Sequence, residues 1–138
     1  MTKPEELRAK YGGVVAFPVT PFRDDLSLDI EGLRQNLTRL MNHPVCAVVA
    51  AGGTGEVYSL TQDEHAQVVE ATVEAVNGKA PVIAGVGFNL MLAVEMAKRS
   101  AAAGADAILA LPPYYPQADE EGLVEYTARS ATRPIWGC

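Results

Sequence analysis

The chain has 138 residues, of which 49% are hydrophobic and 20% are charged. These proportions are typical of a globular protein that buries a core, and they exclude a disordered polyelectrolyte. The formal net charge is −6 and no run of five or more like charges occurs, so we expect neither nucleic acid nor an anionic membrane as a partner. No apolar stretch approaches the roughly 18 to 20 residues that cross a bilayer.

The compartment and the domain count follow from similarly simple features. Cys46 and Cys138 lack C-x-x-C spacing and give no indication of a disulfide framework. The N-terminal segment is polar, unlike a secretory signal. We therefore expect a cytoplasmic protein. No linker or low-complexity segment is present, so residues 1–138 are expected to form a single domain.

Short apolar runs alternate with segments of helical period along the first half of the chain. A strand is expected over 13–19, and a helix over 27–42 carries apolar residues on one face. A second strand is expected over 45–51. The capping-box pattern at 61–64 (TQDE) then begins a helix, which an Asn-Gly pair at 77–78 ends.

The same alternation continues through the second half. A third strand is expected over 81–87 and a helix over 89–103. A fourth strand over 106–113 and a helix over 120–130 follow, and residues 133–136 resemble the start of a fifth strand.

The strands are apolar at nearly every position, as in VVAFPV, CAVVAA, PVIAGV and AILAL. Strands of this kind are buried on both faces, as in parallel sheets covered by helices. The units are then right-handed βαβ crossovers. Periodicity alone leaves two α/β architectures open: a small doubly wound parallel domain, or part of a (β/α)8 barrel, which typically needs about 250 residues.

The most unusual stretch is AAGGTGEVYSL, residues 50–60, directly after the second strand. Ligands gather at the carboxyl ends of the strands in either architecture. Gly52, Gly53 and Gly55 would let backbone amides approach a small anion, with the Thr54 hydroxyl as a further donor. A carboxylate is the ligand that we expect at this loop. The alternative is a tight βα turn whose glycines only permit the backbone path.

Other ligand motifs are absent or incomplete. No lysine follows these glycines as a P-loop requires, and the G-x-G at residues 85–87 is followed by Leu90 where the dinucleotide fingerprint needs glycine. No His, Cys or carboxylate spacing suits a metal. We therefore expect no cofactor and no metal ion. His65 is expected to be solvated or part of a helix cap.

The stretch LPPYYP, residues 111–116, follows the fourth strand. Its two prolines stiffen the chain in front of two tyrosines. Tyr114 and Tyr115 are therefore candidates to point phenol groups into a site. The alternative is that they pack under the loop or at a subunit contact.

Four motifs in order, GVVAFPVTPF, GGTGEVYSLTQDEH, PVIAGVG and LPPYY, resemble the dihydrodipicolinate synthase/N-acetylneuraminate lyase superfamily. The resemblance extends from about residue 11 to residue 135. It implies a (β/α)8 barrel, of which this chain would be the first four βα units and the start of strand five. Members form a Schiff base between a lysine and a 2-keto acid. AAGGTGE, the aromatic residue at 58 and the FPVT of the first strand are similar to the 5-dehydro-4-deoxyglucarate dehydratase branch.

The resemblance also implies roles for particular residues. The glycine loop, with Thr54, would hold the carboxylate next to the keto group of a small keto-acid or sugar-acid substrate. Gly53 stands where synthases carry a hydroxyl residue of a proton relay. Tyr115 matches the tyrosine that crosses a dimer interface in synthases, with Tyr114 as the alternative. A homo-oligomer is implied as well.

Two catalytic residues of the superfamily have no match in this sequence. The resemblance places a Schiff-base lysine on the sixth strand and a tyrosine on the fifth. The lysines present, at positions 3, 10, 79 and 98, do not lie at predicted strand ends. We therefore expect the N-terminal half of a barrel that is inactive alone, as a truncation or a disrupted reading frame would give. Two alternatives remain, a pyruvate-dependent aldolase or synthase and a non-catalytic carboxylate-binding module.

Overall fold

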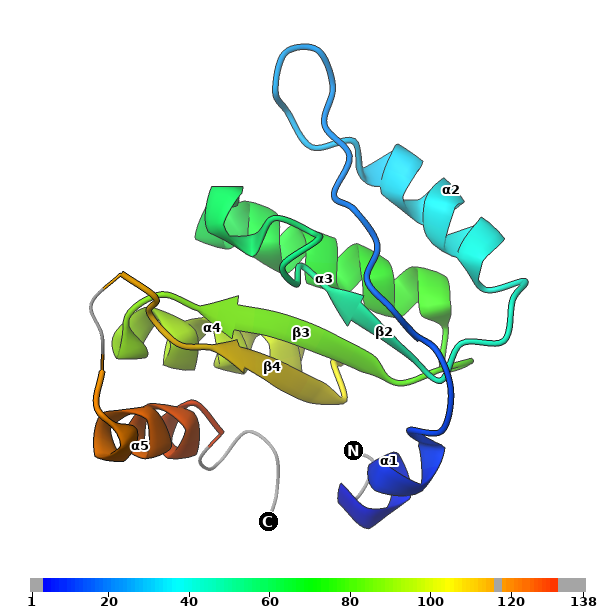
Figure 1. Ribbon diagram of the computed structural model, residues 1–138. Coiled ribbons are helices and arrows are strands. Elements are labelled where there is room, and N and C mark those ends of the chain that lie inside the picture. The colour runs from blue at the N-terminus through cyan, green and yellow to red at the C-terminus, as the bar shows by residue number, and fades with distance from the viewer. Residues whose placement is uncertain (1–3, 116–117, 132–138) are drawn as a thin grey trace.

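The computed structural model describes residues 4–115 and 118–131, and its core is a parallel sheet of short strands (Figure 1). The sheet has the order β1-β2-β3-β4. Each predicted strand that falls in these residues is confirmed, although each is shorter than expected; the predicted strand at 133–136 lies outside them. The strands are β1 (Val15–Ala16), β2 (Ala47–Ala50), β3 (Val82–Gly87) and β4 (Ala107–Leu111).

The predicted helices are also confirmed, with bounds that differ by a few residues. The sequence did not predict two short elements, α1 before the first strand and the 3-10 helix η1 behind the glycine loop. The helices are α1 (Pro4–Lys10), α2 (Ile30–Leu40), η1 (Val57–Ser59), α3 (Gln62–Val76), α4 (Leu90–Ala102) and α5 (Glu120–Ala131).

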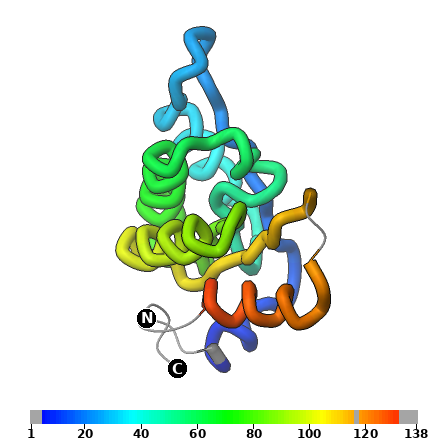
Figure 2. Tube along the Cα trace, turned by 90° about the vertical axis from the view of Figure 1, so that its left-hand side faces the viewer, coloured from blue at the N-terminus to red at the C-terminus, as the bar shows by residue number. Residues whose placement is uncertain are grey.

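The strand order decides between the two architectures. A doubly wound sheet reverses its strand order at a switch point and carries helices on both faces. Here each strand pairs in parallel with the next one in sequence, so right-handed crossovers place successive helices on the same face. Figures 1 and 2 show α3 and α4 together on one face of the sheet. The sheet is therefore singly wound, as in part of a (β/α)8 barrel.

The start of α3 shows why its residues form a helix at this point. The Thr61 hydroxyl accepts a hydrogen bond from the Glu64 amide at 3.3 Å, and the Glu64 carboxylate accepts one from the Thr61 amide at 2.8 Å. This is the predicted capping box. At the other end Asn77 adopts a left-handed conformation with φ 47°, as a helix stop requires.

The main core lies between α2, α3 and the central strands. Leu33 and Leu37 of α2 are 1% and 0% exposed, and they belong to one buried cluster with Val68, Val69 and Val76 of α3. The apolar face predicted for the helix over 27–42 is thereby confirmed. This packing fixes α3 against the sheet, directly behind the glycine loop.

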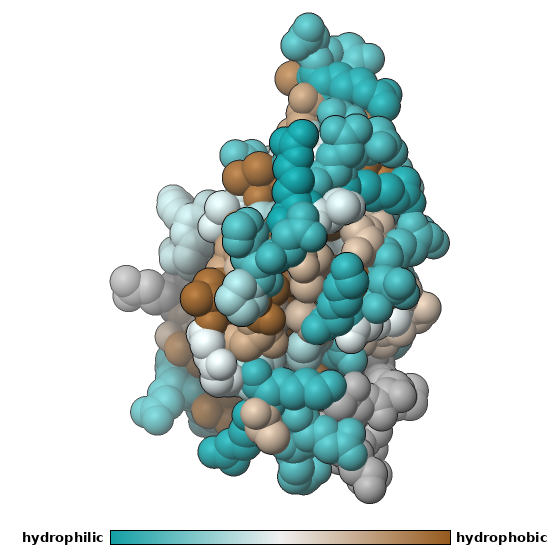
Figure 3. Space-filling model, turned by 90° about the vertical axis from the view of Figure 1, so that its right-hand side faces the viewer, coloured by the Kyte–Doolittle hydropathy of each residue, from teal (hydrophilic) through white to brown (hydrophobic). Residues whose placement is uncertain are grey.

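The prediction that every strand is buried on both faces is wrong for β1 and β4. All of β2 is buried, whereas every residue of β4 is partly exposed. In the β1 segment Val14 is 64% and Val19 is 56% exposed. Figure 3 shows apolar atoms at the surface of the face seen from the right of Figure 1. The cause is position, because β1 and β4 are the edges of the described sheet and have a strand neighbour on one side only.

Replacing Thr61 by Ala should lower the free energy of unfolding by about 1 kcal/mol, because the change removes the side-chain half of the capping box. Urea denaturation monitored by circular dichroism measures this loss. Thr38→Ala is the matched control, since the exposed Thr38 hydroxyl bonds only to the Arg34 carbonyl one turn back in α2. That control should stay within roughly 0.5 kcal/mol of the original protein, and equal losses in the two variants would contradict the assignment of the cap.

Candidate functional site

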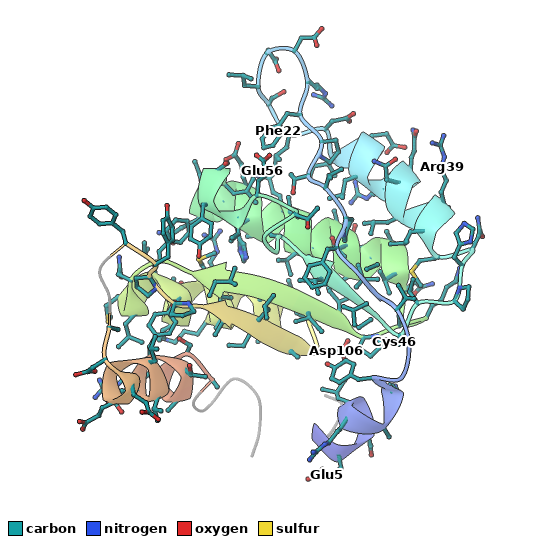
Figure 4. The ribbon with its side chains drawn as sticks, in the orientation of Figure 1. Glu5, Phe22, Arg39, Cys46, Glu56 and Asp106 are labelled. Carbon is teal, nitrogen blue, oxygen red and sulfur yellow. The ribbon has the colours of Figure 1, made fainter. Side chains whose placement is uncertain are left out.

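The glycine loop lies where the carboxyl ends of the strands meet. Figure 4 shows Glu56 of this loop and Phe22, which follows β1, at one end of the sheet, and Cys46 and Asp106, which precede β2 and β4, at the opposite end. Functional residues of parallel βα sheets gather at the carboxyl end. The predicted place of the loop is thereby confirmed.

Two backbone hydrogen bonds give the loop its shape. The Glu56 amide donates to the Gly53 carbonyl at 3.1 Å, and the Val57 amide donates to the Gly52 carbonyl at 3.2 Å. Ala51 before the loop and Glu56 at its end are both left-handed, with φ 48° and 55°. Non-glycine residues adopt this conformation only where their surroundings impose it, so the chain is held tightly on both sides of the glycines.

Close packing leaves little room for a side chain at Gly52 and Gly55. A Cβ atom on Gly52 would lie 2.8 Å from Cγ1 of Val49, and one on Gly55 would lie 3.2 Å from the Pro18 carbonyl oxygen. The Gly55 carbonyl also accepts a hydrogen bond of 2.7 Å from the Thr20 hydroxyl. For these two glycines, the backbone path of a tight βα turn explains the residue type. The contact with Thr20 was not indicated by the sequence.

Gly53 and Thr54 differ from their neighbours because they are exposed. No atom lies within 4 Å of a Cβ built on Gly53, so packing does not explain this glycine. Within residues 4–115 and 118–131, the N–H groups of Gly53, Thr54 and Gly55 donate no hydrogen bond. Three successive free amides, of which that of Gly55 belongs to a buried residue, and a threonine hydroxyl are the donors that an anion-binding loop would need.

An aromatic cluster of Tyr58, Phe88 and Tyr114 joins the loops that follow β2, β3 and β4. The ring of Tyr58 lies 5.1 Å from that of Phe88 and 5.6 Å from that of Tyr114, edge to face in both cases. Phe88 has φ 69°, which is unusual for an aromatic residue. An open pocket of about 440 Å³ borders the cluster, lined by Tyr58, Phe88, Asn89, Pro113, Tyr114 and Tyr115.

The two predicted tyrosines behave differently. Tyr114 and Tyr115 are exposed, by 78% and 92%, and both border the pocket, but of the two only Tyr114 makes a ring contact with Tyr58 among the described residues. Tyr126 of α5 supports the same region, because its hydroxyl donates to the Leu111 carbonyl at 3.2 Å. Burial raises the pKa of the Tyr126 phenol, with a smaller contribution from Tyr58. Tyr58 and Phe88 were not predicted as site residues, although the aromatic residue at 58 was noted in the sequence.

The prediction that His65 is solvated or part of a helix cap is wrong. It is 1% exposed, and its Nε2 atom lies 2.7 Å from the Gly85 carbonyl oxygen. The ring is therefore neither solvated nor part of the cap of α3. Nδ1 is buried and has no hydrogen-bond partner among the described residues. Because a carbonyl only accepts, Nε2 carries the proton in the neutral ring.

Metal-ligand clusters and membrane-spanning helices are both absent from the part of the chain that the structure describes. There, no group of three or more His, Cys, Asp or Glu residues is placed to hold a metal ion. Likewise, none of the helices in residues 4–115 and 118–131 is long and apolar enough to cross a membrane.

The arrangement defines a class of protein before any comparison. A singly wound parallel sheet with a glycine loop at its carboxyl end is the arrangement found in part of a (β/α)8-barrel protein. A family model described as the Dihydrodipicolinate synthetase family matches residues 10–133. The chain belongs to this family.

Similar proteins and structures agree with this assignment. A protein of Methylobacterium radiotolerans named "Probable 5-dehydro-4-deoxyglucarate dehydratase" is 49% identical over 126 residues, which are 91% of this chain and 41% of the relative. A protein of the same name from Arthrobacter sp. is 44% identical over 126 residues, again 91% of this chain and 41% of the relative. The chain thus spans about two fifths of the length of these relatives.

A solved structure shows the same correspondence in three dimensions. The crystal structure of a dihydrodipicolinate synthase from Agrobacterium tumefaciens matches with a TM-score of 0.84 and 32% identity, over 91% of this chain and 42% of that one. The superfamily and the barrel architecture expected from the four sequence motifs are both confirmed.

The environment of His65 predicts a loss of stability in acid. Burial lowers the pKa of His65 below its ordinary value, the nearby Arg99 of α4 adds to this, and the bond to Gly85 opposes it. Arg99 is itself paired with Asp63 at 2.8 Å. Because the folded pKa is the lower one, the contribution is complete above the unfolded pKa of about 6.5 and is lost as the pH falls toward the folded pKa.

Urea denaturation at pH 7.5 and pH 5.5 tests this. The free energy of unfolding should fall by at most about 1.4 kcal/mol per pH unit from this residue, and His65→Gln should remove that part of the pH dependence. His43→Gln, at an exposed position, is the matched control and should keep the pH dependence of the original protein. An unchanged pH dependence in His65→Gln would show that another group is responsible.

Proposed function

We propose that this chain supplies the carboxylate-binding part of a site that acts on 2-keto acids, in an enzyme of the 5-dehydro-4-deoxyglucarate dehydratase kind. The whole reaction would remove one water and one carbon dioxide from 5-dehydro-4-deoxyglucarate to give 2,5-dioxopentanoate. The observation that carries the proposal is the row of free amides at Gly53, Thr54 and Gly55 at the carboxyl end of the sheet. The names of the 41–49% identical relatives support the choice of substrate.

The loop suits a carboxylate next to a keto group. Fixed N–H groups and a hydroxyl bind negative charge without the reorganisation that water needs. The net charge of −6 gives the chain no general attraction for anions, so affinity has to come from these local dipoles. Gly53 lacks the hydroxyl that the synthase pattern carries at this position, which favours the dehydratase over the synthase.

The covalent step would need a group that the described residues do not supply. In a Schiff-base lyase a lysine amine bonds to the keto carbon, and a water leaves as the imine forms. Lys10, Lys79 and Lys98 are exposed and lie in α1, in the turn before β3 and in α4, away from the carboxyl ends of the strands. An exposed lysine lacks the desolvated or cation-flanked surroundings that activate a Schiff-base nucleophile. We therefore propose that residues 1–138 act as a half barrel that binds the substrate but does not react with it.

Binding is tested by titrating the ¹⁵N-labelled chain with pyruvate, the smallest 2-keto acid, and following amide chemical shifts. The Gly53, Thr54 and Gly55 amides should shift most, and methyl pyruvate, which lacks the carboxylate, should not reproduce the effect. Thr54→Val should weaken binding about 3- to 10-fold through the loss of one hydroxyl donor.

Thr127→Val is the matched control for that titration. Thr127 is exposed on α5, and its hydroxyl bonds to the Leu123 carbonyl at 2.9 Å, so its removal should leave the affinity unchanged. Shifts that spread evenly over the chain, or a Thr54→Val affinity equal to that of the original protein, would contradict the assignment of the loop.

Covalent chemistry is tested separately by borohydride reduction in the presence of 5-dehydro-4-deoxyglucarate or pyruvate, with the intact mass as the readout. We expect no adduct on this chain and one adduct per subunit on the Methylobacterium radiotolerans relative, which serves as the positive control. A stoichiometric adduct that maps to Lys10, Lys79 or Lys98 would overturn the proposal that this half acts without a nucleophile.

One further function has support from a specific observation. Solved structures named dihydrodipicolinate synthase match this chain at 30–37% identity, which favours a synthase or aldolase acting on pyruvate. Product analysis on the same full-length relative separates the two functions. Release of carbon dioxide from 5-dehydro-4-deoxyglucarate supports the dehydratase, and turnover of pyruvate without this release supports the synthase.

A further inference from the structure

His65 makes a hydrogen bond that differs in kind from those of the other buried polar side chains. The hydroxyls of Thr72, Ser100 and Ser130 each bond to a carbonyl one turn back in their own helix, at 2.7 Å. His65 instead reaches from α3 to β3 and donates from Nε2 to the Gly85 carbonyl. Like the Tyr126 hydroxyl, which bonds from α5 to the Leu111 carbonyl of β4, it connects a helix to the sheet, and it is the side chain that does so beside the glycine loop.

Gly85 lies at the point where β2 leaves the sheet. The last residue of β2, Ala50, pairs with Ala84, and the next residue, Ala51, turns into the glycine loop. A Cβ atom on Gly85 would lie 2.1 Å from the Ala51 carbonyl oxygen and 3.0 Å from Cα of Gly52. The backbone of β3 at Gly85 is therefore in direct contact with the first residues of the loop.

We propose that His65 is a positioning residue for the glycine loop. Its bond holds the Gly85 peptide in place, and Ala51 and Gly52 rest against that peptide. The helix that carries His65 also begins at the Thr61 cap, directly after η1. α3 thus fixes the loop at both ends, through Gly85 at its start and through the cap behind its end. This inference rests on the proposed function of the loop as a carboxylate site.

The energetics favour a role for the bond over simple filling of space. Leucine at position 65 would occupy most of the same volume and would leave no unpaired buried nitrogen, whereas Nδ1 of His65 has no partner among the described residues. Burying an unpaired polar atom is unfavourable. Leucine would, however, leave the Gly85 carbonyl without this donor beside the loop. Histidine is favoured here because its Nε2–H satisfies the Gly85 carbonyl beside the loop.

The test compares His65→Leu, which removes the donor, with Thr72→Val, which removes a buried hydroxyl bond inside the same helix. The readout is the hydrogen exchange of the Glu56 and Val57 amides, which close the loop on the carbonyls of Gly53 and Gly52. At denaturant concentrations that match global stability, exchange of these two amides should be about tenfold faster in His65→Leu, as the loss of one buried hydrogen bond predicts. Thr72→Val should exchange like the original protein.

Two conservative variants keep the proposal testable if His65→Leu does not fold. The amide nitrogen of Gln can occupy the position of Nε2, so His65→Gln should restore slow exchange. The shorter Asn places its nitrogen near Nδ1, out of reach of Gly85, so His65→Asn should behave like the leucine variant. Equal exchange in the Gln and Asn variants, or equal exchange in the Leu and Thr72→Val variants, would overturn the positioning role.

Pyruvate titration of the same variants separates this inference from the proposed function. If His65 positions the loop, His65→Asn should bind pyruvate about 3- to 10-fold more weakly than His65→Gln. Absence of pyruvate binding by the original protein would contradict the carboxylate site, while the exchange of the Glu56 and Val57 amides would still decide the structural part of the proposal.

Discussion

The contact between Gly85 and the carbonyl of Ala51 is the constraint on which the geometry of the site depends. β2 and β3 run side by side as far as Ala50 and Ala84, and the chain then turns away through a left-handed Ala51. A residue with a side chain at position 85 would collide with that carbonyl at 2.1 Å. The absence of a Cβ on Gly85 therefore allows β2 to end abruptly, and the abrupt end places the glycine loop over the carboxyl end of the sheet.

Much of the fold could be predicted because its signals are local. The capping box at Thr61, the Asn77 stop and the apolar face of α2 depend on residues close in sequence, and the structure contains all three. The glycine loop was recognisable for the same reason. Its partners were not, because Thr20 lies 35 residues from Gly55 and no short motif encodes a contact over that separation.

The prediction that His65 is solvated failed, although the sequence contained a signal for its burial. The residues just before it, Asp63 and Glu64, belong to the polar start of the helix, and this suggested a solvated ring. Its spacing to Val68, Val69 and Thr72 is three, four and seven residues, which is the period of one helical face. All three of those side chains are buried. The helical period therefore predicts a buried His65, whereas the polar residues just before it favoured the wrong prediction of a solvated ring.

Although the edges of the sheet are exposed, the contacts of the glycine loop come from described residues. The loop is held by Thr20 from the β1 side, by Gly85 from β3 and by the start of α3. The central strands β2 and β3 are largely buried, while the exposure is concentrated on β1 and β4. Because the contacts that shape the loop come from described residues, the anion binding that we propose for it would be separable from the covalent chemistry, and the first could exist without the second.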